Sequence, residues 1–244
     1  MTQSAEDTID YAGQELQTFA LATNWKAYVR GKLAPYIVGD VAEVGAGLGE
    51  TTKALIASPQ ARSWTCIEPD AAMAGEIRAI DSAGGFGRPV EVHASTLSRL
   101  PAGRQFDTVI YIDVLEHIED DRGELETALA RLRPGGRIVV LSPAYQSLYS
   151  EFDRAIGHFR RYTAAQLRAI SPPGARIAAS FYLDSVGLMA SAANKLLLRQ
   201  KMPGRGEVLT WDRLMVPLSR IIDPLIGRRF GRSVIVVLTQ TEAA

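Results

Sequence analysis

The sequence has a single cysteine and no excess of charge of either sign. Cys66 is the one thiol among 244 residues, which excludes an internal disulfide framework and a cysteine-based structural zinc site. It lies in an apolar run, so we expect a small core residue there. Lysine plus arginine and aspartate plus glutamate both number 27, giving a net charge of +0. A strongly basic nucleic-acid-binding surface is therefore absent overall, and we expect no nucleic-acid partner.

Long hydrophobic runs are also missing. No apolar run approaches the roughly 20 residues that a membrane span requires. The nearest, residues 185–198, is too short and contains Asn194 and Lys195. The first residues are polar and acidic, without the basic and apolar regions of a signal peptide. These absences favour a cytoplasmic protein, and a hydrophobic content of 47% is enough for a sizeable core.

Short apolar segments alternate with segments of helical periodicity. The expected strands are residues 40–44, 63–68, 89–93, 107–112, 136–142, 176–183 and 233–239. The expected helices between them are residues 51–57, 71–81, 120–132, 163–170, 185–198 and 211–226. The alternation predicts an α/β fold, with a doubly wound, mostly parallel sheet covered by helices on both faces.

A glycine-rich turn follows the first expected strand and opens a helix. Its glycines are Gly45, Gly47 and Gly49, a G-x-G-x-G spacing that differs from the G-x-G-x-x-G of dinucleotide-binding folds. Glycine lets the backbone approach a ligand closely. The spacing favours a nucleoside ligand without a pyrophosphate, such as S-adenosylmethionine (SAM), although a plain strand-to-helix turn is an alternative for this motif alone.

Polar residues gather at the ends of the other strands, where a doubly wound sheet binds its ligands. Glu68 ends the second strand and can accept hydrogen bonds from both hydroxyls of a ribose. This residue would suit a nicotinamide cofactor equally well. The alternative is that Glu68 is merely exposed while Asp70 caps a helix. The third strand ends in residues 94–96 and the fourth in residues 111–117.

Together these segments resemble class I SAM-dependent methyltransferases. The matching motifs are residues 43–49, 68–70, 106–117 and 132–137, in the order and spacing of that family. The resemblance implies a Rossmann-like sheet of seven strands that ends in an antiparallel hairpin. It also implies SAM as the cofactor and S-adenosyl-L-homocysteine (SAH) as the product.

The resemblance assigns roles residue by residue. The cofactor-binding residues that it implies are Glu43, Gly45, Ala46, Gly47 and Gly49 for the methionine end, Glu68 for the ribose, Pro69, Ser95 and Thr96 for the adenine, and Asp113 after the fourth strand. The family often has an acidic residue near position 95 to bind the adenine amino group. Ser95 or a backbone carbonyl would replace that contact here.

A narrower resemblance covers residues 153–163, which read DRAIGHFRRYT. This segment, with residues 230–237, is similar to a bacterial methyltransferase subgroup, some of whose members are fused or adjacent to glycosyltransferases. We predict one domain, since no repeat or low-complexity linker is visible. Residues 1–37 would form an N-terminal helical cover, with helices at about 7–20 and 24–36, or pack on the sheet edge. Residues 38–142 would form the cofactor-binding core, and residues 143–244 the acceptor-side loop, helices and terminal strand pair.

Methyl transfer mainly requires a well-placed acceptor and the exclusion of water. A hydroxyl acceptor also needs a base, and His117 and His158 are the predicted catalytic residues. The alternative for His117 is a helix-start histidine bonded to backbone. Tyr145, Arg160 and Tyr162 are the predicted substrate-binding residues, although the arginines at 160 and 161 could instead pair with nearby carboxylates. No metal site is expected.

The sequence therefore predicts methylation of an oxygen or nitrogen on a small-molecule acceptor, such as a natural product, a sugar or a lipid-linked intermediate. One alternative is a non-catalytic SAM-binding partner subunit. Another is an NAD(P)-dependent oxidoreductase, which would need a further glycine where Glu50 stands and a proton-relay pair. A monomer or homodimer is expected. The basic, apolar C-terminal helices could contact a membrane surface, or simply cover the sheet or form a dimer contact.

Overall fold

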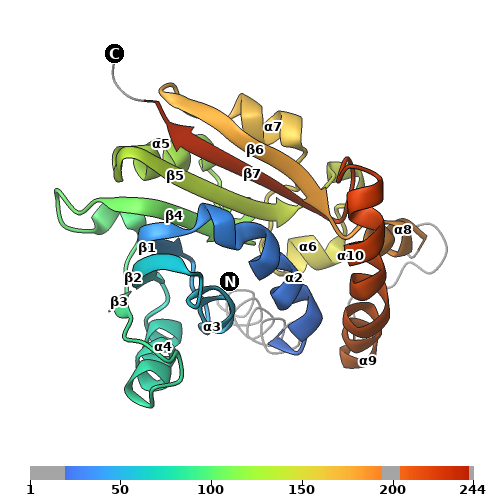
Figure 1. The fold of residues 1–244 in the computed structure, drawn as a ribbon, viewed down its shortest axis with the longest axis horizontal. Coiled ribbons are helices and arrows are strands. Elements are labelled where there is room, and N and C mark those ends of the chain that lie inside the picture. The colour runs from blue at the N-terminus through green and yellow to red at the C-terminus, as the bar shows by residue number, and fades with distance from the viewer. Residues whose placement is uncertain (1–19, 194–203, 242–244) are drawn as a thin grey trace, which may run out of the picture.

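The computed structural model describes residues 20–193 and 204–241, whose strands form one sheet of seven (Figure 1). The strands are β1 (Val38–Val44), β2 (Gln60–Ile67), β3 (Glu91–His93), β4 (Phe106–Ile112), β5 (Leu132–Pro143), β6 (Ala175–Leu183) and β7 (Ser233–Gln240). Their order is β3-β2-β1-β4-β5-β7-β6, and β7 runs antiparallel to both of its neighbours. The predicted α/β fold and its seven strands are confirmed.

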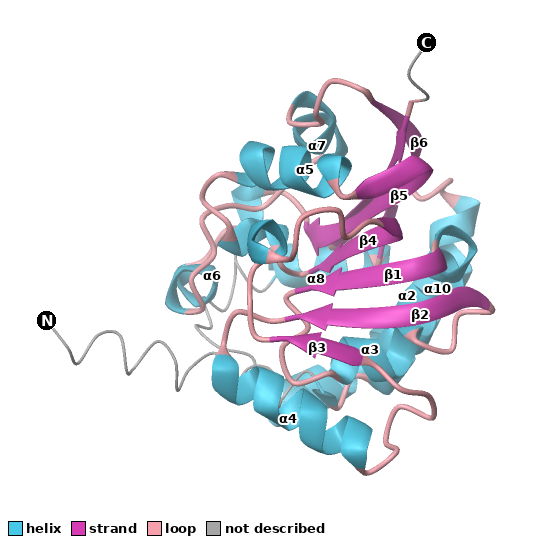
Figure 2. Cartoon of the chain, turned by 90° about the vertical axis from the view of Figure 1, so that its left-hand side faces the viewer, coloured by secondary structure: helices cyan, strands magenta, loops and turns pink. Residues whose placement is uncertain are grey.

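Helices cover both faces of the sheet (Figures 1 and 2). One apolar cluster joins the sheet to α2 (Thr23–Leu33), α3 (Glu50–Leu55), α4 (Ala71–Ser82) and the C-terminal helices α9 (Arg205–Thr210), η6 (Trp211–Met215) and α10 (Val216–Leu225). The other cluster joins it to η2 (Leu97–Arg99), α5 (Asp121–Ala130) and α7 (Ala164–Ala169). Cys66 is fully buried in the first cluster, as expected.

Residues 133–136, which read RPGG, have the residue types of a tight turn and predict one before the fifth strand, but they lie inside β5 instead. Phe106 of β4 is opposite Leu132, but Thr108 is opposite Arg137, so β5 contains a bulge between these two pairs. Gly135 within the bulge has φ +75°, a conformation that glycine adopts without a steric penalty. The expectation of a tight turn was therefore wrong in its placement, because a bulge uses the same residue types.

Two segments of the chain differ from expectation in their helical content. Residues 143–161 show no regular helix or strand pattern in the sequence and were expected to form the acceptor-side loop, but they contain η4 (Gln146–Leu148) and α6 (Glu151–Ala155). The helix predicted from residue 185 is α8 (Ser185–Ala193), and its remaining residues, like the helix predicted at about 7–20, lie outside the described part of the chain. None of the helices in residues 20–193 and 204–241 combines the length and apolar character needed to span a bilayer.

Two buried carboxylates fasten the C-terminal helices to the rest of the fold. Asp184, after β6, accepts hydrogen bonds from Trp211 Nε1 (2.7 Å) and Ser219 Oγ (2.7 Å). Asp223 of α10 accepts one from the Tyr28 hydroxyl of α2 (2.8 Å). Both aspartates are fully buried, and buried charges need such partners. The network holds α2 and the segment at Trp211 beside the carboxyl ends of the central strands.

Candidate active site

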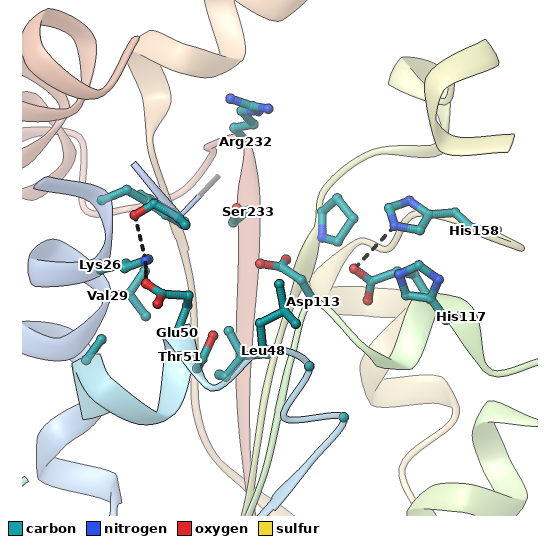
Figure 3. A pocket seen from close by; sticks show the side chains of 18 of the residues that line it. Lys26, Val29, Leu48, Glu50, Thr51, Asp113, His117, His158, Arg232 and Ser233 are labelled. Carbon is teal, nitrogen blue, oxygen red and sulfur yellow. Dashed lines mark hydrogen bonds and ion pairs between the residues drawn. The ribbon is translucent and has the colours of Figure 1, made fainter. Parts of the chain in front are cut away.

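The strand order reverses between β1 and β4, so their carboxyl ends meet at the edge where doubly wound sheets bind ligands. A cavity of about 250 Å³ lies at this edge. Its wall includes the glycine turn, α2, α3, the segment after β4, the loop after β5 and the chain before β7. Figure 3 shows Lys26 and Glu50 on one side of this cavity, His117 and His158 on the other, and Asp113 between them.

The glycine turn forms one end of the cavity. Gly45, Gly47 and Gly49 have φ values of +68°, +56° and +76°. A Cβ atom on Gly45 would lie 2.6 Å from a methyl carbon of Val114. Side chains at these positions would be strained or would clash, so the turn needs glycine to pass close to the cavity. Gly45, Ala46 and Gly47 line the cavity, which fits a ligand lying against bare backbone, as expected for SAM.

Glu43 lies beneath the turn and not in the cavity wall. Its buried carboxylate accepts hydrogen bonds from Thr52 Oγ1 (2.7 Å) and Trp64 Nε1 (2.8 Å). Burial raises the pKa of Glu43 to about 7, although both hydrogen bonds oppose the shift. Glu43 thus joins α3 and β2 below the glycine turn. Because it does not line the cavity, it is not placed for the predicted direct contact with the methionine end of SAM.

Glu68 lies next to the turn. Its carboxylate accepts hydrogen bonds from the backbone N–H groups of Gly47 (2.8 Å) and Asp70 (2.9 Å). The backbone N–H of Ser95 donates to the Glu68 carbonyl (3.1 Å), which brings the ends of β2 and β3 together. Asp70 caps α4 through the N–H groups of its first turn. Glu68 does not line the 250 Å³ cavity, and neither do the other predicted cofactor residues near this edge, Gly49, Pro69, Ser95 and Thr96.

Asp113 and Glu116 follow β4 directly. Asp113 has φ +54°, an uncommon conformation for a residue other than glycine, and it lines the cavity. Asp113 is an exposed residue of the cavity wall, but the surrounding protein displaces water from its carboxyl group and raises its pKa to about 6, against the opposing charges of His158, Arg232 and Arg161. The single turn η3 (Leu115–His117) then carries Glu116, whose side chain is fully buried and whose two carboxylate oxygens have no hydrogen-bond partner among the described residues.

The two predicted catalytic histidines meet edge to face, with ring centroids 4.5 Å apart. His158 Nδ1 is 3.0 Å from Asp153 Oδ1, and its Nε2 is 3.9 Å from Glu116 Oε1. Displacement of water by the surrounding protein, together with the charge of His158, lowers the pKa of His117 to about 4, although His117 is open to the cavity. The structure therefore brings together two histidines that are distant in the sequence, at the end of the cavity opposite Lys26 (Figure 3).

Asp153 organises the loop after β5. Its carboxylate accepts hydrogen bonds from Arg161 Nε (2.7 Å) and from the backbone and hydroxyl of Ser150 (both 2.8 Å). Burial alone would raise the pKa of Asp153, but hydrogen bonds from His158 and Arg161 outweigh it and hold the pKa well below its usual range. The carboxylate pairing anticipated for Arg161 is thus present.

The three predicted substrate-binding residues do not line the cavity. Tyr145 stacks on Tyr182 with ring centroids 5.5 Å apart. Arg160 Nη1 and the Tyr162 hydroxyl each donate to Asp121 (both 2.7 Å). Arg160 and Tyr162 therefore fasten the loop to α5 through Asp121, a buried carboxylate that the sequence pattern did not single out. The Tyr145 ring fastens the loop to β6.

The pattern also missed several cavity residues. Lys26 of α2 donates to Glu50 of α3 (2.7 Å), and both side chains are partly exposed in the cavity wall. Arg232, just before β7, lies over the Trp211 ring at 4.8 Å. These residues reach the site from helices and turns at both ends of the chain. No motif spacing relates them to the glycine turn. The one available signal was the helix expected at about residues 24–36, which includes Lys26 and was predicted as part of the N-terminal cover.

The comparisons with known proteins agree with this geometry. Residues 42–138 match a family model described as a methyltransferase domain. Among solved structures, the chain is similar to the N-methyltransferase NodS from Bradyrhizobium japonicum in complex with SAH, with 16% identity, a TM-score of 0.53, and coverage of 88% of this chain and 84% of that one. It is also similar to an S-adenosylmethionine-dependent methyltransferase from Clostridium acetobutylicum, with 12% identity, a TM-score of 0.56, and coverage of 89% and 91%.

Two further similarities concern proteins of other activity or size. The [4+2]-cyclase SpnF shares the fold at 17% identity and a TM-score of 0.59, over 89% of this chain and 82% of that one. The polyketide synthase component of compactin nonaketide synthase from Penicillium citrinum is 30% identical over 114 residues, which are 44% of this chain and 4% of that protein. The chain therefore spans only a small part of that curated relative.

The fold and the glycine-turn cavity define a Rossmann-like, nucleoside-binding α/β protein. The family match narrows this class: residues 42–138 match a methyltransferase domain, the fold is shared with SAM-dependent methyltransferases, and SAM is the cofactor that these similarities support. The oxidoreductase alternative gains no support from any of these similarities. The narrower resemblance of residues 153–163 to a bacterial subgroup stays a prediction.

Proposed function

We propose that this enzyme methylates an oxygen or nitrogen atom of a small-molecule acceptor. The observation that carries the proposal is one cavity that begins at the glycine turn and ends at the His117–His158 pair. When bound, SAM supplies an electrophilic methyl group. The glycine turn would hold its methionine portion, so the acceptor would enter from the side of the histidines.

The wall of the cavity suits a small acceptor held away from water. Trp25, Val29, Phe152 and Trp211 supply apolar surface. Positioning an acceptor against a reactive methyl group lowers the entropic part of the barrier, and an apolar wall excludes competing water. The acceptor would therefore have an apolar portion as well as the atom that is methylated.

His117 and His158 are proposed to take part in the removal of the acceptor's proton. Because its pKa is lowered to about 4, His117 is neutral near pH 7 and has a free nitrogen lone pair. The ionised Asp153 accepts a hydrogen bond from Nδ1 of His158, which leaves Nε2 as the lone-pair nitrogen. Both imidazoles can thus act on an acceptor proton, either directly or through a group that they bind.

On the cofactor side, the proposed contacts divide between the turn and its neighbours. Glu68 would bind the ribose by exchanging its hydrogen bond with the Gly47 N–H for ribose hydroxyls. Lys26 is the cation in the cavity wall on the side of α3, so it would attract the carboxylate of the methionine portion. Glu43 would act indirectly, through the position of the turn above it.

The first experiment measures SAM and SAH binding by isothermal titration calorimetry. Turnover is then followed with labelled SAM and separate panels of hydroxyl and amine acceptors. We expect one bound cofactor per chain and label transfer to one panel. Absence of cofactor binding would refute the proposal. Cofactor binding without transfer to any acceptor would favour the non-catalytic partner subunit instead.

Substitution of the histidines tests their role. We expect His158→Gln and His117→Gln to bind SAH like the wild type but to lower turnover by about 10²- to 10⁴-fold, the usual effect of losing proton-transfer catalysis. His93→Gln is the matched control, because His93 pairs with Glu91 on β3 and does not line the cavity. Wild-type turnover in both active-site variants would remove the histidines from the mechanism.

A further inference from the structure

We propose that Glu116, His117 and His158 form a binding site for a divalent transition-metal ion at the acceptor end of the cavity. One ligand atom from each residue lies within 4.8 Å of the ligand atoms of the other two. Two imidazoles and one carboxylate form a ligand set that proteins use for catalytic zinc and related ions, with further coordination positions left open.

The distances within the cluster suit an ion better than a direct contact. Glu116 Oε1 and His158 Nε2 are 3.9 Å apart, which is too long for a hydrogen bond. Two ligands that each lie about 2.1 Å from one ion can be at most about 4.2 Å apart. The pair therefore already has a spacing that a shared ion can bridge, and only small side-chain rotations are needed to bring in His117.

Glu116 gives an independent reason to expect a cation. Its side chain is 0% exposed, and neither carboxylate oxygen has a hydrogen-bond partner among the described residues. A buried carboxylate without hydrogen bonds is costly, even with His158 Nε2 3.9 Å away, and such groups are normally paired or coordinate metals. A bound ion would satisfy this carboxylate from the cavity side, where His117 and His158 converge.

The surroundings also favour a cation. The Asp153 carboxylate holds Nδ1 of His158, and this carboxylate–histidine arrangement orients Nε2 as a metal ligand in many proteins. Three carboxylates at this end of the cavity, Asp113, Glu116 and Asp153, face two guanidinium groups, Arg161 and Arg232.

An ion here would deepen the proposed function, on which this part of the inference rests. A divalent cation lowers the pKa of a hydroxyl that binds it, so the acceptor can lose its proton to water near neutral pH. The methyl–sulfur bond then breaks as the methyl–oxygen bond forms, and a neutral sulfide is left. A protonated amine would be repelled by the ion. The site therefore points to a hydroxyl acceptor and narrows the oxygen-or-nitrogen proposal, and it also revises the expectation that no metal is bound.

The test uses the full chain without a histidine tag, stripped with a chelator and dialysed. Mn²⁺, Zn²⁺, Co²⁺ and Mg²⁺ are titrated separately by calorimetry, and bound Mn²⁺ is followed by electron paramagnetic resonance. We expect about one ion per chain. Glu116→Gln and His117→Asn should each weaken ion binding by more than about tenfold. Glu119→Gln, at an exposed position on the same segment, is the matched control and should bind like the wild type.

SAH binding by each protein separates folding from metal loss and separates this inference from the proposed function. Normal SAH binding with no saturable ion binding to the wild type would overturn the metal site but leave methyl transfer standing. Equal ion affinity in the wild type and Glu116→Gln would also overturn it. If Glu116→Gln fails to bind SAH, His117→Asn decides, since His117 is open to the cavity and contributes less to the core.

A second inference concerns a different surface, the outer face of η6 and α10. Leu214, Leu218, Ile221 and Leu225 are 61%, 50%, 65% and 81% exposed. Their spacing of four, three and four residues places them on one helical stripe. Large apolar side chains exposed in a row usually mark an interaction surface. No element within the described part of the chain covers this stripe.

The charges beside the stripe point to an anionic lipid surface as the occupant. Arg213, Arg220 and Arg229 are exposed, whereas the two aspartates of this segment, Asp212 and Asp223, are buried and hydrogen-bonded inward. An apolar stripe with cationic neighbours is typical of helices that lie in a membrane interface. A two-fold contact with a second copy would instead bring like-charged arginines together. We therefore infer that α10 lies on the surface of an anionic membrane.

Sedimentation with vesicles tests this surface. We expect the protein to sediment with vesicles of phosphatidylcholine and phosphatidylglycerol but much less with phosphatidylcholine alone. Leu218→Ser with Ile221→Ser, and separately Arg220→Ala, should reduce sedimentation severalfold, whereas Arg99→Ala on η2 should not. Absence of sedimentation would overturn the inference. A dimer that light scattering detects in the wild type but not in the leucine–isoleucine variant would identify a second copy as the occupant.

Discussion

Replacing Glu43 with glutamine should change how the stability of this enzyme depends on pH. The side chain is 2% exposed, and the groups that act on its charge are the donors Thr52 and Trp64 and the like charge of Glu68. Burial raises its pKa from 4.5 to about 7 in the folded state. In the unfolded chain, water restores the ordinary value. Between these two values, the folded protein holds a proton that the unfolded chain has lost.

The sign and size of the effect follow from this difference. Where the folded state binds more protons, the free energy of unfolding falls as the pH rises. One pKa unit corresponds to about 1.4 kcal/mol, so a shift from 4.5 to about 7 corresponds to roughly 3 kcal/mol. Stability linked to Glu43 is therefore fully present below about pH 4.5 and is lost by about pH 7.

Glutamine should remove this dependence with little change in packing. Both hydrogen bonds reach the same carboxylate oxygen, Oε2, so an amide oxygen can accept both. The assay is urea unfolding of the wild type and Glu43→Gln at pH 5 and pH 8. The variant should gain roughly 2–3 kcal/mol relative to the wild type between pH 5 and pH 8, because part of the wild type's stability linked to Glu43 is already lost at pH 5. Using the difference between two proteins cancels the titration of all other groups.

Glu126→Gln, on the exposed side of α5, is the control and should show no such change. If the difference between Glu43→Gln and the wild type is the same at pH 5 and pH 8, Glu43 does not titrate with a raised pKa. A variant that loses stability relative to the wild type as the pH rises would show that the fold favours the charged carboxylate. Either result refutes the reasoning from burial.

Three other substitutions probe the cavity wall. Gly45→Ala should lower the melting temperature and weaken SAH binding in calorimetry, because Gly45 has φ +68° and an added Cβ would meet Val114. The control is Gly75→Ala, in open space on α4, which should be neutral or slightly stabilising in the same assays. Lys26→Met should weaken SAH binding in calorimetry through loss of the cation beside the glycine turn, without lowering stability by more than about 1 kcal/mol, since its ion pair is partly exposed. Asp153→Ala should lower the free energy of unfolding in urea by about 3–5 kcal/mol, because it leaves the guanidinium of Arg161 buried without its partner; a loss below 1 kcal/mol would contradict that account.

The sequence predicted the sheet well because of a simple physical constraint. Parallel strands buried on both faces are nearly continuous apolar runs, and the turns between them need glycine or proline. All seven strands therefore left a local pattern, as in the run from Ile138 to Leu141 of β5. The one misplaced turn, at Gly135, used the same residue types for a bulge. Local composition could not tell the two apart.

The cavity was predicted only where its residues belong to strand ends. Gly45, Asp113 and His117 follow strands and line the cavity as the topology requires. Lys26 and Arg232 reach it from parts of the chain that pack there through long-range contacts. Tyr145 is the opposite case: this aromatic residue of the predicted acceptor loop is stacked on Tyr182 of β6 and does not line the cavity, and its predicted role in substrate binding stays a prediction. Whether a loop side chain faces a cavity depends on partners that no local pattern specifies.

The acceptor end shows how a local motif and a distant one combine. The 3₁₀ turn η3 brings Glu116 and His117 to the cavity wall, and Asp113 reaches the same wall from just before that turn. That turn alone leaves a buried carboxylate without a partner. His158 arrives some forty residues later, and Asp153 fixes its orientation through a single turn of helix, α6. Neither segment is a site alone. The buried carboxylate lies in one segment and the oriented imidazole in the other, and the 3.9 Å between them is the gap that the proposed ion would bridge.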